Sequence, residues 1–591
     1  MKRPLTDEDL TERAAIDGRV VFATAAFAIA AALVALLDRV GAPPRLVAIL
    51  GPAVALVGLA SVGFLLRTMR VSRFYSAGRS VPAAYAGFAF ASLAAGLVTP
   101  FLPPVAGGPS FRVLLGGFAG GLALAALAGG PLLRKTGAFS IPDLIAGRFP
   151  NLALRLGVVA VIAGVGFLIG VAGFAGAVAG FSRATGLGVG ASLWLGGIVL
   201  FFIVAPGGVA GLVWAAAGAA GMTMAGLALP LLVLYTRGVG LPLPAFGDVA
   251  AWSASLSRMA EWNLRAGDIQ PTGWGAILAV VLGVGALAPL LTPAMATRDT
   301  SAARGAGAAG LFWCLIFAGL AAATLALSTL ALDAATVGAR PEALPAPVIE
   351  ASRAGLIEIC GGHPATPAAA RAACAARSGF SGALSGADVV ANGRFLLLGL
   401  PALRGLGEAL AGLAASGVIA LALVLAAAGF QTCATALGHD AFYRVREATA
   451  MTSRRLAVTR AILAVAIIAA GLLLAGRQPD PRALVGLAIV LCVATVTPLL
   501  ALSVWPRAEG VDAAAALLAG LASAEAMIWW RGGLESLDGV GAAAITACVV
   551  SMLTGFAASF LHPADPMSLG GAFAHGLLRG RGDLINPDKG A

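Results

Sequence analysis

Long apolar runs alternate with short polar loops along the whole chain of 591 residues. About 20 apolar residues in a helix cross a bilayer, and fourteen runs are close to that length. The alternating pattern of β-barrel strands is absent, so the runs predict transmembrane helices. The predicted spans are 20–37, 46–66, 83–102, 113–133, 156–181, 189–205, 209–235, 274–296, 311–332, 410–437, 456–474, 484–504, 511–530 and 540–561.

The composition excludes several classes of protein. Hydrophobic residues make up 59% of the chain and charged residues only 11%, against roughly 25% charged in soluble domains. There are too few charges to cover the surface of a soluble enzyme or to keep a chain disordered. No GxSxG, HExxH or P-loop motif is present, so we expect no enzyme. The chain is predicted to be an all-α polytopic membrane protein that is embedded in a lipid bilayer.

The net charge of +11 does not indicate a nucleic-acid partner. The basic residues stand singly or in small groups between apolar runs, without a stripe of interleaved aromatic residues. When only short loops and the termini are counted, one side of the membrane carries 23 basic residues and the other side carries 10. The richer side holds both termini, so both termini are predicted to be cytoplasmic, in the inner membrane of a bacterium.

Two of the six cysteines, Cys360 and Cys374, share the long polar loop 333–409. The charge rule places this loop outside the cell, in a compartment that permits disulfides. The spacing alone leaves two alternatives open, a disulfide between them or two unpaired thiols.

Two spans carry residues that interrupt helices. Proline removes a backbone donor and frees carbonyls, which inside a membrane need a cavity, water, an ion or polar neighbours. The two spans are separated by four others, so they begin two five-helix units that are inverted relative to each other, as in transporters. The interrupting residues are Gly87, Gly96 and Pro100 in span 83–102, and Gly283, Gly285, Pro289 and Pro293 in span 274–296.

This repeat divides the chain into five predicted parts. Residues 1–82 form a cytoplasmic N-terminus and two extra helices, and 83–235 form the first five-helix repeat. Residues 236–273 form an external loop, and 274–504 form the second repeat, which contains the external loop 333–409. Residues 505–591 form two further helices and a cytoplasmic tail. The candidate substrate-binding residues beside the two interruptions are Thr99, Gly96, Pro289 and Thr292.

Polar residues near the interrupted helices could bind a hard monovalent cation, which prefers oxygen ligands. Candidates are Ser92 and Thr99 in the first interrupted span and Gln431, Thr432 and Thr435 in the tenth span. The alternative is that these hydroxyl groups donate hydrogen bonds back to their own helices.

The run Phe74-Tyr75-Ser76-Ala77-Gly78-Arg79-Ser80-Val81-Pro82 resembles the solute:sodium symporter family, and its acetate-permease-like (cation/acetate symporter) branch in particular. Further matching runs lie in order over about 70–590. They include Ser140-Ile141-Pro142-Asp143-Leu144, Gly207-Gly208, Arg298-Asp299-Thr300-Ser301-Ala302-Ala303-Arg304 and His439-Asp440-Ala441-Phe442-Tyr443-Arg444.

The resemblance implies a LeuT-type 5+5 inverted-repeat core that couples sodium entry to the uptake of an organic solute. It implies a cation held by carbonyls near Ser92 and Ala95 and by the hydroxyl of Thr435. Several polar core positions of the family are apolar here. They fall on Ala86, Leu93 and Gly96 and on Ala215, Ala216 and Ala219.

The predicted function is a symporter that moves a small organic solute, a monocarboxylate such as acetate, with sodium as the coupling ion and no other cofactor. The apolar core positions motivate one alternative. In it, the chain is a transport-incompetent or uncoupled relative that serves as a sensor or as a subunit of a membrane complex, with a small membrane subunit as partner.

Overall fold

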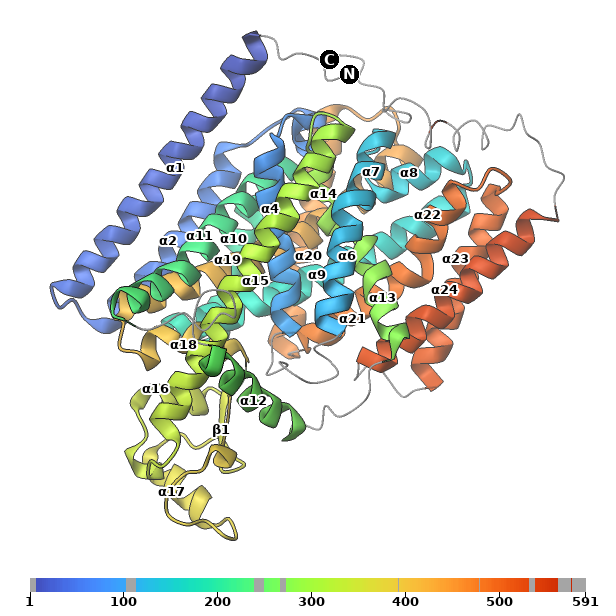
Figure 1. Ribbon diagram of the computed structural model, residues 1–591. Coiled ribbons are helices and arrows are strands. Elements are labelled where there is room, and N and C mark those ends of the chain that lie inside the picture. The colour runs from blue at the N-terminus through green and yellow to red at the C-terminus, as the bar shows by residue number, and fades with distance from the viewer. Residues whose placement is uncertain are drawn as a thin grey trace.

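The computed structural model describes residues 7–101, 113–238, 249–265, 273–391, 393–477, 479–530, 537–561 and 576. Within these residues, twelve helices are long and apolar enough to cross a membrane. One further span is the bent pair α13 (Trp274–Gly285) and α14 (Ala288–Met295), and α10 (Val189–Val204) is a shorter apolar helix. These elements account for the fourteen predicted spans, which lie side by side in one bundle (Figure 1).

The spanning elements of the first half are α1 (Asp7–Arg39), α2 (Pro44–Leu65), α4 (Ala83–Val98), the consecutive segments η3 (Val113–Phe118), α6 (Ala119–Leu124), η4 (Ala125–Gly129) and α7 (Gly130–Thr136), then α9 (Leu152–Thr185), α10 and α11 (Val209–Thr236). Those of the second half are α13 and α14, α15 (Thr300–Thr336), α19 (Glu408–Thr435) with η7 (Ala436–Arg446), α20 (Thr452–Gly476), α21 (Pro481–Leu491) with η8 (Cys492–Val496) and α22 (Thr497–Ser503), α23 (Gly510–Trp530) and α24 (Leu537–Ser559). Because the number of crossings is even, α1 begins and α24 ends at the same face, which we call the terminal face. The short helices α3 (Val71–Ser76), η1 (Ala77–Arg79) and α8 (Ile141–Arg148) lie at this face.

Helix α19 is the centre of the bundle, and α9 packs along it through glycine. A Cβ added at Gly173 would lie 2.5 Å from the backbone nitrogen of Ala426, and one at Gly166 would lie 2.7 Å from the backbone nitrogen of Cys433. Small residues let helix backbones touch in a membrane, where packing replaces the hydrophobic effect. Many of the 79 glycines of this chain therefore serve helix packing.

Three buried arginines and the half-buried Arg460 bind the carbonyl ends of neighbouring helices at the terminal face. A helix C-terminus leaves carbonyls unpaired and carries partial negative charge, which a guanidinium group neutralises with several donors. The bonds are Arg79 to Gly137 O (2.5 Å), Arg134 to Thr297 O (2.8 Å), Arg148 to Ser503, Trp505 and Ala508 O (3.2, 2.9 and 2.9 Å), and Arg460 to Ala205 and Thr68 O (2.7 and 2.8 Å).

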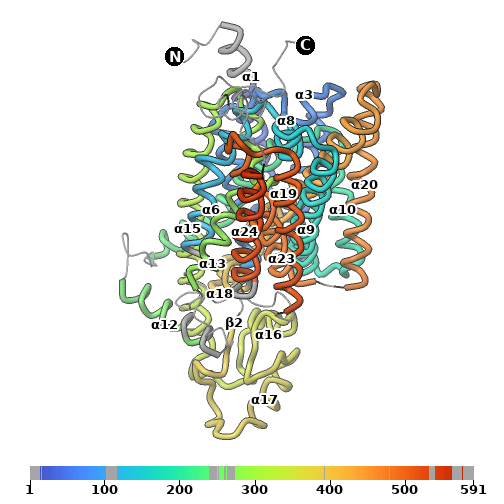
Figure 2. Tube along the Cα trace, turned by 90° about the vertical axis from the view of Figure 1, so that its right-hand side faces the viewer, coloured from blue at the N-terminus to red at the C-terminus, as the bar shows by residue number. Residues whose placement is uncertain are grey.

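A small loop domain with its own apolar core lies beyond the opposite face (Figures 1 and 2). It consists of α12 (Val249–Arg265), η5 (Pro341–Ala343), α16 (Ala346–Arg353), β1 (Ile357–Ile359), α17 (Pro367–Ala375), η6 (Gly386–Asp388), β2 (Val389–Ala391) and α18 (Gly393–Leu403). Strands β1 and β2 pair antiparallel, with Ile357 opposite Ala391. Arg258 of α12 anchors the domain to α15 through Asp333, at 2.9 Å.

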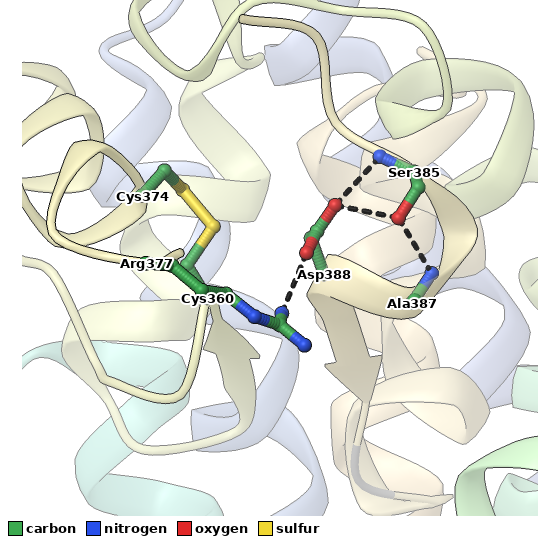
Figure 3. The surroundings of a disulfide bond; sticks show 6 residues. All are labelled: Cys360, Cys374, Arg377, Ser385, Ala387 and Asp388. Carbon is green, nitrogen blue, oxygen red and sulfur yellow. Dashed lines mark hydrogen bonds and ion pairs between the residues drawn. A yellow bond between two sulfur atoms is a disulfide. The ribbon is translucent and has the colours of Figure 1, made fainter. Parts of the chain in front are cut away.

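The structure contains the disulfide between Cys360 and Cys374, one of the two alternatives that the spacing left open (Figure 3). Cys360 and Gly361 both have positive φ, +52° and +84°, and Ile359 and Gly362 exchange two backbone hydrogen bonds across them. This is a two-residue turn in which both central residues are left-handed. The turn directs Cys360 toward α17, where Cys374 is buried.

Candidate functional site

The predicted interruption of span 274–296 is confirmed. Helices α13 and α14 meet at an angle of 41° across a short break between Gly285 and Ala288. The amide of Ala286 still donates to Leu282 O, and Pro289 stands in the first turn of α14, where its missing donor costs nothing. The hydroxyl of Thr497 on α22 lies 3.5 Å from Leu282 O, so a polar group from another helix reaches the break.

The predicted interruption of span 83–102 is wrong. Helix α4 is continuous from Ala83 to Val98, and Ala95 O accepts both the backbone amide and the hydroxyl of Thr99. The glycines serve packing instead: a Cβ at Gly87 would lie 2.7 Å from Ala306 O, and one at Gly96 would lie 2.7 Å from Leu421 O. Pro100 follows the last turn, where a proline interrupts no helical hydrogen bond.

The candidate cation residues on α19 are only partly brought together. Gln431 and Thr435 are in contact, with Gln431 Nε2 donating to Thr435 Oγ1 at 3.2 Å. Both side chains are buried, and Gln431 Oε1 has no hydrogen-bond partner within the described residues. Thr432 Oγ1 instead donates to Ala428 O of its own helix, at 2.8 Å.

Ser92 and Ala95 lie at another level of the membrane. The backbone of α4 touches α19 where Gly96 meets Leu421 and Leu425, and Thr435 is ten residues beyond Leu425. At 1.5 Å per residue along antiparallel helices, Ser92 and Thr435 are separated by about 9 Å or more along the bundle axis. The groups that the resemblance implies for one sodium site therefore do not form a single cluster in this structure.

The remaining candidate residues lie on two helices that pack together. Pro289 and Thr292 are buried on α14, which packs against the helix that leads to Gly96 and Thr99. The hydroxyl of Thr292 lies 3.4 Å from Ala288 O, and that of Ser92 donates to Ala89 O at 2.9 Å. These hydroxyl groups follow the alternative interpretation of the sequence, in which each one bonds to its own helix.

Sequence reasoning missed a buried polar cluster at the terminal face, which joins α8, η7 and α20. Ser140 Oγ donates to Asp440 Oδ2 at 2.6 Å, and Asp440 and His439 are fully buried. Asp143 lies beside them and pairs with Arg444 at 3.4 Å. The available signal was that two polar runs, 140–144 and 439–444, both close apolar spans, although 299 residues separate the start of one from the start of the other.

The protonation of His439 follows from its partners. Arg455 Nη2 approaches His439 Nδ1 at 2.5 Å, and since arginine can only donate, Nδ1 accepts. A neutral His439 then carries its proton on Nε2, which faces Asp440 Oδ1 at 3.8 Å. Potential metal-ligating atoms of Asp143, His439 and Asp440 lie within 4.8 Å of one another, but this tautomer leaves no lone pair on Nε2 for a metal.

Tyr75 of α3 is the fourth element's contribution to the cluster, and its side chain is buried. Its hydroxyl lies 2.7 Å from Thr459 Oγ1, and Arg455 lies over its ring at 5.0 Å. Burial raises the pKa of the Tyr75 phenol, so the neutral form is favoured. The cluster thus connects four separate elements of the terminal face, and within the described residues His439 Nε2 and Asp440 Oδ1 have no hydrogen-bond partner.

Comparisons with known proteins place this geometry in context. No family model matches the sequence. An uncharacterized symporter of Cupriavidus necator is 30% identical over 141 residues, which cover 24% of this chain. The chain therefore spans about a fifth of that relative, 21% of its length.

A solved structure shows the fold over nearly the whole chain. The substrate-bound, outward-open state of a Na+-coupled sialic acid symporter superposes with a TM-score of 0.62 at 16% identity, over 89% of this chain and 99% of the symporter. Crystal structures of the manganese transporter of Eremococcus coleocola give only 0.38 at 14% identity, over 82% of this chain and 95% of theirs. The proteins matched here are transporters rather than enzymes, and the chain has an all-α polytopic membrane fold with a LeuT-type core.

Proposed function

We propose that this protein is a secondary transporter that moves a small organic solute together with sodium. The observation that carries the proposal is the similarity of fold to a Na+-coupled symporter over 89% of the chain. The break between α13 and α14 supports it, since interrupted helices at mid-membrane are where transporters of this fold bind solutes.

The proposed substrate is a monocarboxylate such as acetate, taken up across the inner membrane of a bacterium with the terminal face in the cytoplasm. The run from Phe74 to Pro82 supports the acetate-permease-like branch. The first turn of α14 supports an anionic substrate, because a helix N-terminus inside a membrane carries partial positive charge without a buried basic residue. Pro289 and Thr292 lie on this short helix, and Gly96 and Thr99 lie toward the end of span 83–102, whose helix α4 packs against α14.

The proposed cation ligands are centred on the contact between Gln431 and Thr435. Gln431 Oε1 is buried without a partner within the described residues, and such an oxygen is costly unless something binds it. Ser92 and Ala95 would join this site only if α4 and α19 slid past each other. Thr432 lies on α19 itself and would need only to release its hydrogen bond to Ala428 O. Sodium coupling is therefore proposed together with a movement of α4.

The experiment is uptake of radiolabelled acetate into proteoliposomes, driven by a sodium gradient or by choline as control. We expect uptake to require sodium and to fall at least tenfold in Thr435→Ala and in Gln431→Met, as expected for the loss of about 1.4 kcal/mol or more of coupling. Thr223→Val, which changes a buried hydroxyl on α11, is the matched control. Equal uptake in choline and in sodium would refute sodium coupling. If no organic acid is taken up, transport itself is refuted.

A second function is favoured by one specific observation. Helix α4 is continuous, and it faces Leu421 and Leu425 where the family resemblance implies cation ligands. This arrangement supports an uncoupled or transport-incompetent relative that acts as a sensor or as a subunit of a membrane complex. Folded protein that transports nothing but copurifies with a membrane partner at a fixed ratio would favour it.

A further inference from the structure

An empty groove lies on the surface of the bundle between α11 and α15. Its volume is about 320 Å3, within the range of ligand pockets. It lies in the half of the bundle that faces the loop domain, because α11 ends there at Thr236. The lining residues are Ala228, Leu229, Leu231, Leu232, Tyr235, Gly319, Leu320 and Ala323.

The walls of the groove are apolar and its floor is made of small residues. Leu229, Leu232 and Tyr235 are 40%, 55% and 60% exposed, so they face the surroundings of the bundle. A Cβ added at Gly319 would meet no heavy atom within 4 Å. The groove is therefore open at Gly319, and in a membrane the solvent that reaches it is lipid.

Two unpaired cationic groups stand at the end of the groove nearest the loop domain. Arg237 directly follows α11 and is exposed, and its guanidinium group makes no hydrogen bond or ion pair with the described residues. Arg404 follows α18, and its Nε is buried without a partner within the same residues. Leu400 and Leu406, on either side of Arg404, belong to the same apolar cluster as Leu231 of the groove.

We infer that this groove binds a phospholipid with an anionic phosphodiester headgroup, with one acyl chain between α11 and α15 and the phosphate at the level of Arg237 and Arg404. Guanidinium groups bind phosphate oxygens through paired donors, and basic residues at a membrane surface attract anionic headgroups. Tyr235 lines the groove two residues before Arg237, as aromatic residues do at the membrane interface.

The charge of the rim argues for a lipid over a second copy of this chain. A symmetric dimer places the same patch of both subunits face to face, so Arg237 and Arg404 would approach their own copies. Like charges brought together at an interface of low dielectric repel each other. An anionic headgroup satisfies the same two groups.

The test measures lipid bound to the full-length protein, purified in detergent, stripped of lipid and then titrated with dioleoyl-phosphatidylglycerol in native mass spectrometry. We expect the wild type to form a 1:1 complex that Gly319→Trp weakens at least tenfold, because the indole occupies the space of the acyl chain. Gly164→Trp is the matched control, since a Cβ at Gly164 on α9 also meets no atom within 4 Å.

The headgroup is tested separately. Arg237→Gln and Arg404→Gln should each weaken phosphatidylglycerol binding about fivefold. Dioleoylglycerol, which lacks the phosphate, should bind these variants as it binds the wild type. If Gly319→Trp loses its thermal transition, Gly319→Leu replaces it with a smaller side chain in the same space.

Equal phosphatidylglycerol binding by the wild type and the folded Gly319 variants would overturn the inference. So would a Gly319 variant that changes the oligomeric state without releasing lipid, because that result assigns the groove to a second copy. Neither measurement involves solute uptake, so a failure here is distinguishable from a failure of the proposed transport.

Discussion

Gln431 offers a test of what binds near the end of α19, beside Thr435. Gln431→Met keeps the length of the side chain but removes both polar atoms. In this structure Oε1 has no partner within the described residues, and a buried acceptor without a partner costs about 1–3 kcal/mol. The substitution also loses the hydrogen bond from Nε2 to Thr435, worth about 0.5–1.5 kcal/mol. The balance is a stabilisation of about 1 kcal/mol.

The control is a buried polar group that is fully paired. Thr223 Oγ1 lies 2.8 Å from Ala219 O and 3.1 Å from Gly417 O, the second on another helix. Thr223→Val removes this bond between helices, which costs about 0.6 kcal/mol in membrane proteins. The two substitutions are thus expected to shift stability in opposite directions.

The assay is thermal unfolding of purified protein by intrinsic fluorescence, in choline chloride and in sodium chloride. In choline, Gln431→Met should raise Tm by about 1 °C, given the size of the chain, and Thr223→Val should lower it. If sodium binds Oε1, sodium should raise the Tm of the wild type and of Thr223→Val but not of Gln431→Met. A lower Tm for Gln431→Met in choline would refute the reasoning, because it would mean that Oε1 has a partner in the absence of sodium.

Three further predictions concern the terminal face and the loop domain. Arg148 is buried, its pKa is lowered by burial to about 10, and it donates hydrogen bonds to three carbonyls. Arg148→Gln should therefore destabilise the protein by about 3 kcal/mol, measured as a fall in Tm. Arg148→Lys should lower Tm by less. The raised pKa of Tyr75 stabilises the fold below pH 10, and this contribution should be lost by about 1.4 kcal/mol per pH unit above pH 10; a Tm series from pH 9 to 11 should show this loss in the wild type but not in Tyr75→Phe. Cys360→Ser opens a disulfide between residues 14 apart and should cost the loop domain about 3 kcal/mol, seen as faster proteolysis between β1 and α17, while equal proteolysis rates would contradict it.

The sequence by itself determined the membrane class and the crossings. Apolar length needs no tertiary contact, because about 20 residues of helix must match the thickness of the bilayer. The break before Pro289 was also predicted from local residues, because proline lacks a backbone donor and is favoured in the first turn of a new helix.

Tertiary structure decided what sequence patterns left ambiguous. Gly87 and Gly96 were predicted to interrupt a helix. The sequence alone cannot distinguish a glycine that ends a helix from one that lets another backbone approach. Here the backbone of α15 approaches Gly87 and that of α19 approaches Gly96. The family resemblance placed Thr435 at a cation site with Ser92. Their separation depends on where α4 and α19 touch, which no local pattern contains.

The buried cluster of Asp143, His439 and Asp440 has the same physical basis. Each of its residues lies in a short polar run that alone predicts an ordinary helix end. Only the packing of α8 against η7 buries both runs and brings Ser140 Oγ into a hydrogen bond with Asp440 Oδ2. The sequence thus determined which segments enter the membrane, and the contacts between those segments decided which polar atoms are left to bind something.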